Sequence, residues 1–156
     1  MAGPKVEKRK ASGVAFIEHT GPYDKVPWDE YIEELYGWAK AKRVMPGFHP
    51  FAVYYDSPQQ TPPANLRSDV CITFKGIAQG SGRVRTREMP EMMVSTISHK
   101  GPGSEYPNTY AKLAKWNEDH GYVGTGPPIE VYSKRPEVVN GVTILYAKVM
   151  FPVKKK

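Results

Sequence analysis

Two halves of the chain carry the same series of motifs, and this internal repetition constrains the fold more than any other feature of the sequence. Each half has a His-x-Gly-Pro segment, a Leu and a Trp at helical spacing, and a Pro-led run that ends in Val-Tyr. The matches are His19–Pro22 with His99–Pro102, Leu35 and Trp38 with Leu113 and Trp116, and Pro50–Tyr54 with Pro128–Tyr132. Three matches in the same order indicate an internal duplication.

Each half also predicts the same elements, a strand, a helix and two further strands. Apolar and β-branched runs bounded by Gly and Pro are typical of strands, and apolar residues at helical spacing are typical of a packed helix. The first half is expected to form strands at 14–19, 51–55 and 70–74 and a helix between Pro27 and Pro46. The second half is expected to form strands at 92–99, 128–132 and 142–151 and a helix at about 108–120. The predicted fold class is therefore α+β, with duplicated βαββ units related by a pseudo-twofold axis.

The domain organisation follows from this duplication. One domain is expected at residues 12–153. Its predicted parts are repeat one at 12–75, a Gly-rich linker at 76–88 and repeat two at 89–153. Residues 1–11 are predicted to be a flexible basic arm, and residues 154–156 a basic tail.

The net charge of +6 arises from 22 basic and 16 acidic residues. Seven basic groups lie near the two ends, which we interpret as solvated termini that bind polyanions only weakly and with strong salt dependence. They are Lys5, Lys8, Arg9, Lys10, Lys154, Lys155 and Lys156. We find no nucleic-acid-binding motif.

Cofactor, metal and membrane signals are missing from the sequence. One cysteine, Cys71, excludes an intrachain disulfide and a Cys cluster for zinc. His19 and His99 end equivalent strands but have no third ligand at metal-binding spacing, so we interpret them as solvated strand-end residues. No apolar run approaches the roughly 20 residues of a membrane span, and the N-terminus does not read as a signal peptide. We therefore expect a cytoplasmic protein without metal or cofactor, and leave its oligomeric state open.

One segment resembles a known family. The run Phe51–Pro58, continued by Thr61–Pro63 and Leu66–Val70, is similar to the "VYYDxPxxTPxxxLRxD" segment of the GyrI-like (DNA gyrase inhibitory protein-like) family. His19–Tyr23 resembles the "HxGPY" opening of that family, and Pro128–Tyr132 resembles its "PxxEVY" segment. The resemblance covers about residues 12 to 153 and extends to the effector-binding domains of AraC-type and MerR-type regulators.

The resemblance implies two helices over a curved antiparallel sheet, with a central groove between the repeats for amphipathic or cationic small molecules. Some family members are similar to hydrolases that open cyclopropane-bearing alkylators, and the founding member is linked to gyrase. The favoured hypothesis is a stand-alone small-molecule-binding protein for amphipathic, cationic or aromatic compounds, acting in toxin or drug sequestration. The alternatives are a hydrolase of reactive electrophiles and a protein-interaction role such as gyrase modulation.

Glu130 is the leading candidate for a functional residue. Strand alternation places Glu130 and Tyr132 on one face, and we expect Ile129 and Val131 on the other face, toward the helices. A carboxylate among aromatic rings suits a cation, and a desolvated one suits a general base that positions water. The full set of predicted ligand-binding residues is Glu130, Tyr132, Tyr54, Ala52, Trp38, Tyr36, Tyr110, Trp116 and Met92, with Glu130 as the catalytic residue if the protein is an enzyme.

Overall fold

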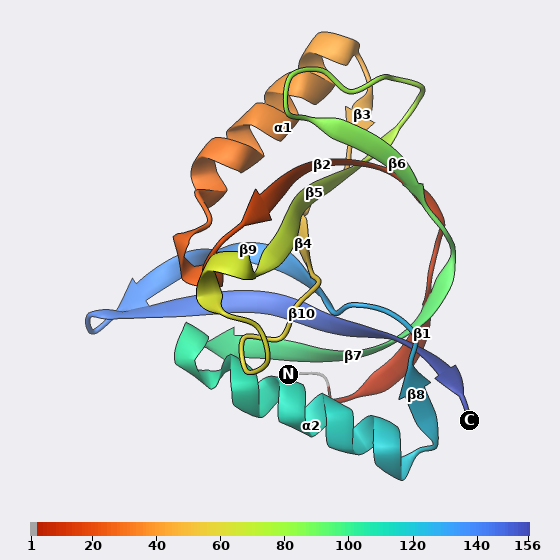
Figure 1. The fold of residues 1–156 in the computed structure, drawn as a ribbon, viewed down its shortest axis with the longest axis vertical. Coiled ribbons are helices and arrows are strands. Elements are labelled where there is room, and N and C mark those ends of the chain that lie inside the picture. The colour runs from red at the N-terminus through yellow and green to blue at the C-terminus, as the bar shows by residue number, and fades with distance from the viewer. Residues whose placement is uncertain (1–2) are drawn as a thin grey trace. The chain divides into compact units, whose positions relative to one another are not determined.

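The computed structural model describes residues 3–156, which form two compact units (Figure 1). Residues 10–91 form the first unit, and the N-terminal residues up to Arg9 join residues 92–156 in the second unit. Each unit contains antiparallel strands and one long helix, in agreement with the predicted α+β class. Among residues 3–156, no helix is both long enough and apolar enough to cross a membrane.

The first unit pairs its four main strands in the order β6-β2-β5-β4, and the short strand β3 pairs with the end of β5. All of these pairs are antiparallel. The elements are β2 Ser12–Thr20, α1 Trp28–Lys42, β3 Met45–Pro46, β4 Phe51–Tyr54, β5 Arg67–Lys75 and β6 Arg85–Met89. Two single-turn 3₁₀ helices, Tyr23–Lys25 and Pro63–Asn65, lie in the connections.

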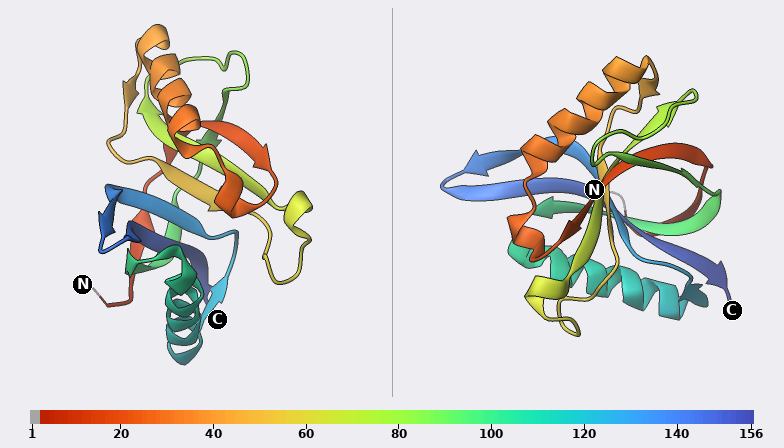
Figure 2. Two further views of the ribbon diagram at one scale, coloured as in Figure 1. Left: turned by 90° about the vertical axis from the view of Figure 1, so that its left-hand side faces the viewer. Right: turned by 45° about the horizontal axis from the view of Figure 1, so that its top comes forward.

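Helix α1 covers one face of β2 and β5 (Figures 1 and 2). Ile17 and Val70 lie opposite each other on these strands and belong to the buried cluster that includes Leu35 and Trp38 of α1. Full burial of one such apolar side chain stabilises the fold by about 1.5–3 kcal/mol. The helix ends where Arg43 takes a left-handed φ of 56° and its N–H donates to the carbonyls of the last turn.

The second unit pairs its main strands in the order β1-β7-β10-β9, and β8 pairs with the end of β10. Ile97 of β7, Val149 of β10 and Leu113 of the helix form its buried cluster. The elements are β1 Lys5–Arg9, β7 Met92–Gly101, α2 Tyr106–Asp119, β8 Tyr122–Gly124, β9 Ile129–Val139 and β10 Val142–Lys155. A single-turn 3₁₀ helix, Gly103–Glu105, precedes α2.

The structure differs from the sequence prediction at the chain ends and at the linker. Residues 5–9 of the expected flexible arm form β1 and pair with β7, while Met1 and Ala2 lie outside the described residues. Residues 85–88 of the expected linker belong to β6 and pair with β2. Lys154 and Lys155 of the expected tail continue β10 and pair with β8. These polar segments have no apolar alternation of their own, and they form strands because a neighbouring strand offers its backbone N–H and C=O groups.

Helix α2 begins at Tyr106, two residues before the predicted start. Pro107 does not prevent this, because a proline is tolerated in the first helical turn, where no carbonyl of the helix needs its N–H. Strand β9 also extends beyond the predicted 128–132, because it continues as a hairpin with β10.

Asn140 and Gly141 join β9 to β10 with left-handed φ angles of 51° and 79°. Left-handed angles at both central residues are those of a type I′ hairpin turn, as Asn-Gly predicts. Gly141→Ala should therefore destabilise the protein by about 1 kcal/mol, since a Cβ strains this conformation. Gly37→Ala is the matched control, because Gly37 lies in α1 with open space around its Cβ position. It should stabilise by about 0.5–1 kcal/mol. Urea unfolding measures the change in the free energy of unfolding for both substitutions. Changes in the same direction would contradict the assigned turn.

Candidate functional site

Glu130 lies on β9 directly opposite Val149 of β10, which in turn lies opposite Ile97 of β7. Because directly opposed residues share a face, Glu130 lies on the face that carries the core under α2. Tyr132 lies on the same face, opposite Ala147. The predicted pairing of Glu130 with Tyr132 is therefore correct, but the predicted orientation is wrong. The face with Ile129 and Val131 points away from α2.

Two tyrosine hydroxyls donate to the Glu130 carboxylate. Tyr110 of α2 donates to Oε2 in a short hydrogen bond, and Tyr132 donates to Oε1 over 3.0 Å. Glu130 is only 6% exposed. Burial raises the pKa of Glu130 above its usual 4.5, and the tyrosine hydroxyls partly counteract this rise. Glu130 is thus a desolvated carboxyl group held by neutral donors.

A third tyrosine extends the aromatic surroundings of this carboxyl group. Tyr106 stacks on His99 with ring centroids 4.0 Å apart, and its ring meets the Tyr110 ring edge-on at 6.4 Å. Tyr110 also meets Phe151 edge-on at 5.4 Å. Burial and the Glu130 charge both raise the pKa of Tyr106, whose buried hydroxyl has no described partner at normal hydrogen-bond geometry. Tyr106 therefore lies close enough to Glu130 for the two groups to shift each other's pKa.

His99, Tyr106 and Phe151 were not among the predicted site residues. His99 was interpreted as solvated, but it is 4% exposed, and its Nδ1 lies 2.7 Å from the Thr109 hydroxyl. Tyr106 precedes the predicted helix start at about residue 108, so the sequence prediction does not include its helical spacing to Tyr110, one turn later. Extending the helix through Pro107 would have revealed this i, i+4 pair.

Trp116 and Met92 belong to the second unit but lie apart from Glu130. Trp116 comes six residues after Tyr110, about 9 Å along α2, and it stacks on His120 and Tyr122. Met92 begins β7 opposite Arg9. It is five residues, or about 16 Å, along that strand from Ile97, which is level with Glu130. The structure therefore does not group either residue with the Glu130 carboxyl group.

The other four predicted residues lie in the first unit. Trp38 is a core residue whose indole N–H donates to the Gln79 carbonyl over 3.1 Å, and the Tyr36 hydroxyl donates to Gly47 O over 2.9 Å. Ala52 is fully buried opposite Val70, on the face toward α1. Tyr54 shares that face and meets Tyr23 edge-on at 4.7 Å. A groove that joins these residues to Glu130 stays a prediction.

A second buried carboxylate, Asp69, lies on the opposite face of the first unit's sheet. Tyr55 donates to it over 2.5 Å and Arg87 pairs with it at 3.3 Å. Burial raises the pKa of Asp69. Burial and the hydrogen bond to Asp69 together raise the pKa of Tyr55 to about 12. Nearby, Arg67 holds Asp56 through two hydrogen bonds of 3.0 Å. Asp56 and Asp69, the two acidic residues of the "VYYD…LRxD" segment, are therefore both already paired with neighbouring side chains.

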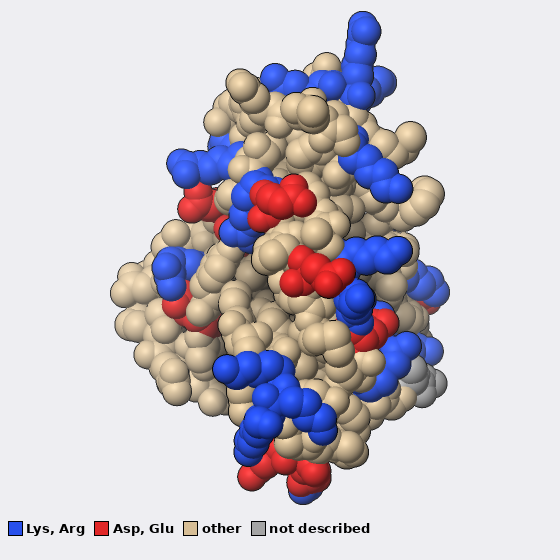
Figure 3. Space-filling view, turned by 90° about the vertical axis from the view of Figure 1, so that its right-hand side faces the viewer, with Lys and Arg blue, Asp and Glu red and all other residues tan. Residues whose placement is uncertain are grey.

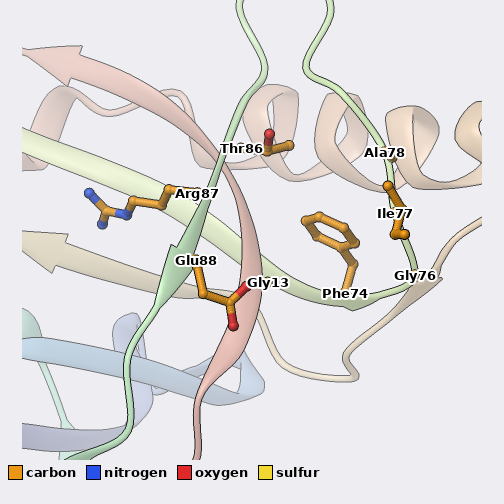
Figure 4. Close-up of a pocket in the computed structure, with 8 residues that line it drawn as sticks. All are labelled: Gly13, Phe74, Gly76, Ile77, Ala78, Thr86, Arg87 and Glu88. Carbon is orange, nitrogen blue, oxygen red and sulfur yellow. The ribbon is translucent and has the colours of Figure 1, made fainter.

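One surface pocket of about 290 Å³ lies in the first unit (Figure 4). Residues of β2, β5 and β6 and of the loop 76–78 line it, with Gly13, Phe74 and Glu88 among them. None of the predicted ligand-binding residues lines this pocket. Arg87, at its edge, is already paired with Asp69.

A family model for the GyrI-like small molecule binding domain matches residues 3–154. The chain belongs to the GyrI-like family. Among curated relatives, DNA gyrase inhibitor 1 of Dickeya dadantii is 35% identical over 86 residues, which are 52% of this chain and 52% of the relative. This chain thus spans about half the length of that relative.

Solved structures support the fold. The C-terminal domain of EcmrR is 21% identical with a TM-score of 0.81, over 99% of this chain and 98% of that one. A hydrolase from Listeria innocua is 14% identical with a TM-score of 0.70, over 97% and 91%. SAV2435, solved with bound tetraphenylphosphonium, is 8% identical with a TM-score of 0.58, over 98% and 94%. Each of these likenesses concerns the fold alone.

The raised pKa of Glu130 predicts a pH-dependent stability difference. A carboxyl whose pKa is raised on folding favours the folded state when protonated, and this contribution is lost as the pH rises from the unfolded value near 4.5 through the folded pKa. The free energy of unfolding of Glu130→Gln should therefore equal that of the parent protein in acid. At neutral pH it should exceed that of the parent by about 1 kcal/mol. Thermal unfolding from pH 4 to 8 measures this. Glu33→Gln, at an exposed position of α1, controls for net charge. A difference that does not change with pH would contradict the assignment.

Proposed function

We propose that this GyrI-like chain binds amphipathic small molecules that are cationic or aromatic, with Glu130 as the anionic anchor. The observation that carries the proposal is a carboxyl group that is 6% exposed and held by tyrosines. The groups that act on its pKa are burial and three tyrosine hydroxyls; among the described residues, no lysine or arginine contributes. Asp69 differs, because Arg87 neutralises it.

A buried carboxylate without a cationic partner costs free energy, and a ligand cation can offset that cost. Aromatic rings next to the carboxylate add an attraction of about 0.5–2 kcal/mol for a desolvated cation through their quadrupoles. Tyr106, Tyr110 and Tyr132 provide such rings around Glu130. The bound cation in SAV2435, a protein of similar fold, is consistent with this ligand class.

Tetraphenylphosphonium is a direct probe of the proposal. Calorimetric titration should detect binding that weakens at least about tenfold, or 1.4 kcal/mol, in Glu130→Gln. Neutral triphenylphosphine oxide should show little change between the two proteins, because it does not use the charge. Glu33→Gln should bind both compounds as the parent does. Equal loss of the cation and the neutral compound would show that the substitution damages the site's shape rather than its charge.

Hydrolysis of a reactive electrophile is the second candidate. The observation that favours it is the raised pKa of Glu130, since a carboxylate with a raised pKa accepts a proton from water more readily. Glu130 would then take a proton from water while the water oxygen bonds to a ring carbon and the strained C–C bond breaks. The electron pair of that bond would pass to the electron-accepting group of the substrate, which would then receive the proton and leave Glu130 as a carboxylate.

This candidate predicts that Glu130→Gln loses turnover of a cyclopropane-bearing electrophile by about 10²-fold or more, while binding of that neutral substrate survives. Mass spectrometry of the ring-opened product measures turnover. Unchanged turnover in Glu130→Gln would remove Glu130 from the base role, and no turnover by the parent protein would leave ligand binding as the function.

A gyrase-directed role rests on the name of the Dickeya dadantii relative, of which this chain covers about half. Weak polyanion binding rests on the basic residues near the chain ends. On the face shown in Figure 3, basic side chains lie among acidic ones rather than in one continuous patch. Both roles stay predictions.

A further inference from the structure

We propose that two ion pairs of opposite polarity determine which of the two short edge strands, β1 and β6, pairs with which sheet. We call β1 and β6 the arm strands. Only Lys10 and Ala11 separate β1 from β2, and only Pro90 and Glu91 separate β6 from β7. A two-residue connection commonly forms a hairpin. However, β1 pairs with β7 of the second unit, and β6 pairs with β2 of the first unit.

The strand registers of the two units correspond, with an offset of 80 residues between β2 and β7 and of 79 residues between β5 and β10. His19 lies opposite Ser68 of β5, and His99 lies opposite Ala147 of β10. The arm positions also differ by 80 residues, in the opposite direction along the chain: Arg87 lies opposite Val14, and Glu7 lies opposite Val94. Arg87 and Glu7 therefore hold equivalent positions. Asp69, opposite Glu18, and Lys148, opposite Ser98, are equivalent as well.

Each arm forms an ion pair across its unit at these positions, with the charges exchanged. In the first unit the arm supplies the cation: Arg87 pairs with Asp69 at 3.3 Å and lies 4.7 Å over the Phe16 ring. In the second unit the arm supplies the anion, because Glu7 pairs with Lys148. The Asp69 side chain is 5% exposed, so the first pair is largely shielded from water.

The competing local hairpins would place the arms in the same registers on the wrong sheets. A two-residue turn at 10–11 puts Arg9 opposite Ser12, and therefore Glu7 opposite Val14, where Arg87 now lies. A turn at 90–91 likewise puts Arg87 opposite Val94, where Glu7 now lies. Glu7 would then face Asp69, and Arg87 would face Lys148. Both contacts join like charges, which destabilises cross-strand pairing.

Turn chemistry acts in the same direction. A type I′ turn needs left-handed angles at both central residues, which Pro90 cannot adopt and which neither Lys10 nor Ala11 favours. Either arm could pair with either sheet in the same register. The charges that form the ion pairs therefore distinguish one arm from the other.

Engineered disulfides report which sheet holds β1. Val6 lies opposite Ser95 in the structure, whereas a local hairpin would place it opposite Ala15. Directly opposed strand residues have a Cα separation that suits a disulfide. In a Cys71→Ala background, Val6→Cys with Ser95→Cys (pair 6/95) should crosslink within the monomer. Val6→Cys with Ala15→Cys (pair 6/15) should not. Non-reducing electrophoresis and peptide mapping measure both yields.

The decisive variant is Glu7→Lys with Arg87→Glu, which reverses both arms and keeps the net charge. The 6/95 yield should fall at least about twofold and the 6/15 yield should rise, since each arm now matches the other sheet. The matched control is Lys8→Glu with Glu88→Lys, the adjacent equivalent positions, whose side chains alternate to the other strand face. It should leave both yields unchanged. Unchanged yields in the decisive variant, or equal losses in the control, would overturn the proposal.

Hydrogen exchange of the β1 amides tests the proposal even if the variant Glu7→Lys with Arg87→Glu does not fold. Glu7→Lys alone should lower protection at residues 5–9, because the introduced ammonium group would face Lys148. Adding Lys148→Glu should restore it by re-forming the pair with exchanged charges. Failure of the second substitution to restore protection would also overturn the proposal.

Discussion

The antiparallel pairing between the first and last long strands of each unit is the constraint on which the other features depend. These pairs are β2 with β5 and β7 with β10. Side chains alternate across a strand, so each register assigns every residue either to the helix-covered face or to the opposite face. A slip of one residue would move Glu130 away from Tyr110 and Asp69 away from Tyr55. The chemistry of both carboxylates is therefore set by the backbone.

The two carboxylates illustrate two ways to bury a charge. Asp69 has a tyrosine donor and an arginine, so its charge is neutralised within the first unit. Glu130 has tyrosine donors and, among the described groups that shift its pKa, no cation. Neutral donors offset only part of the desolvation, which is why the pKa of Glu130 is raised. An unneutralised carboxyl group of this kind is a better candidate for binding or proton transfer than one in an ion pair.

The equivalent registers also show how the two halves differ. Ala52 and Glu130 hold equivalent strand positions, as do Tyr54 and Tyr132. On the other face, Asp69 corresponds to Lys148 and Arg87 to Glu7. The scaffold is thus similar in the two units while the charges differ at equivalent places. On the helix-covered face, one unit has the Glu130 carboxyl group where the other has Ala52. On the opposite face, the acidic and basic partners of the ion pair are exchanged between the units.

Much of this protein could be predicted from its sequence. The repeated motifs and local periodicity predicted the α+β class, both helices and the long strands, because these signals act within about ten residues. The "VYYD…LRxD" and "PxxEVY" segments identified the family. Alternation along one strand placed Glu130 with Tyr132, since that relation needs only the strand period.

Tertiary structure alone decided three features. Arm strands β1 and β6 are short and polar, and they are strands only because distant strands pair with them. The orientation of Glu130 toward α2 depends on which sheet face the helix covers, which alternation along a single strand does not specify. The partners Tyr106, Tyr110 and His99 come from other elements, and their contact is set by packing. Sequence determined what the two helices and the long strands form, whereas long-range pairing determined the arm strands and which side chains meet.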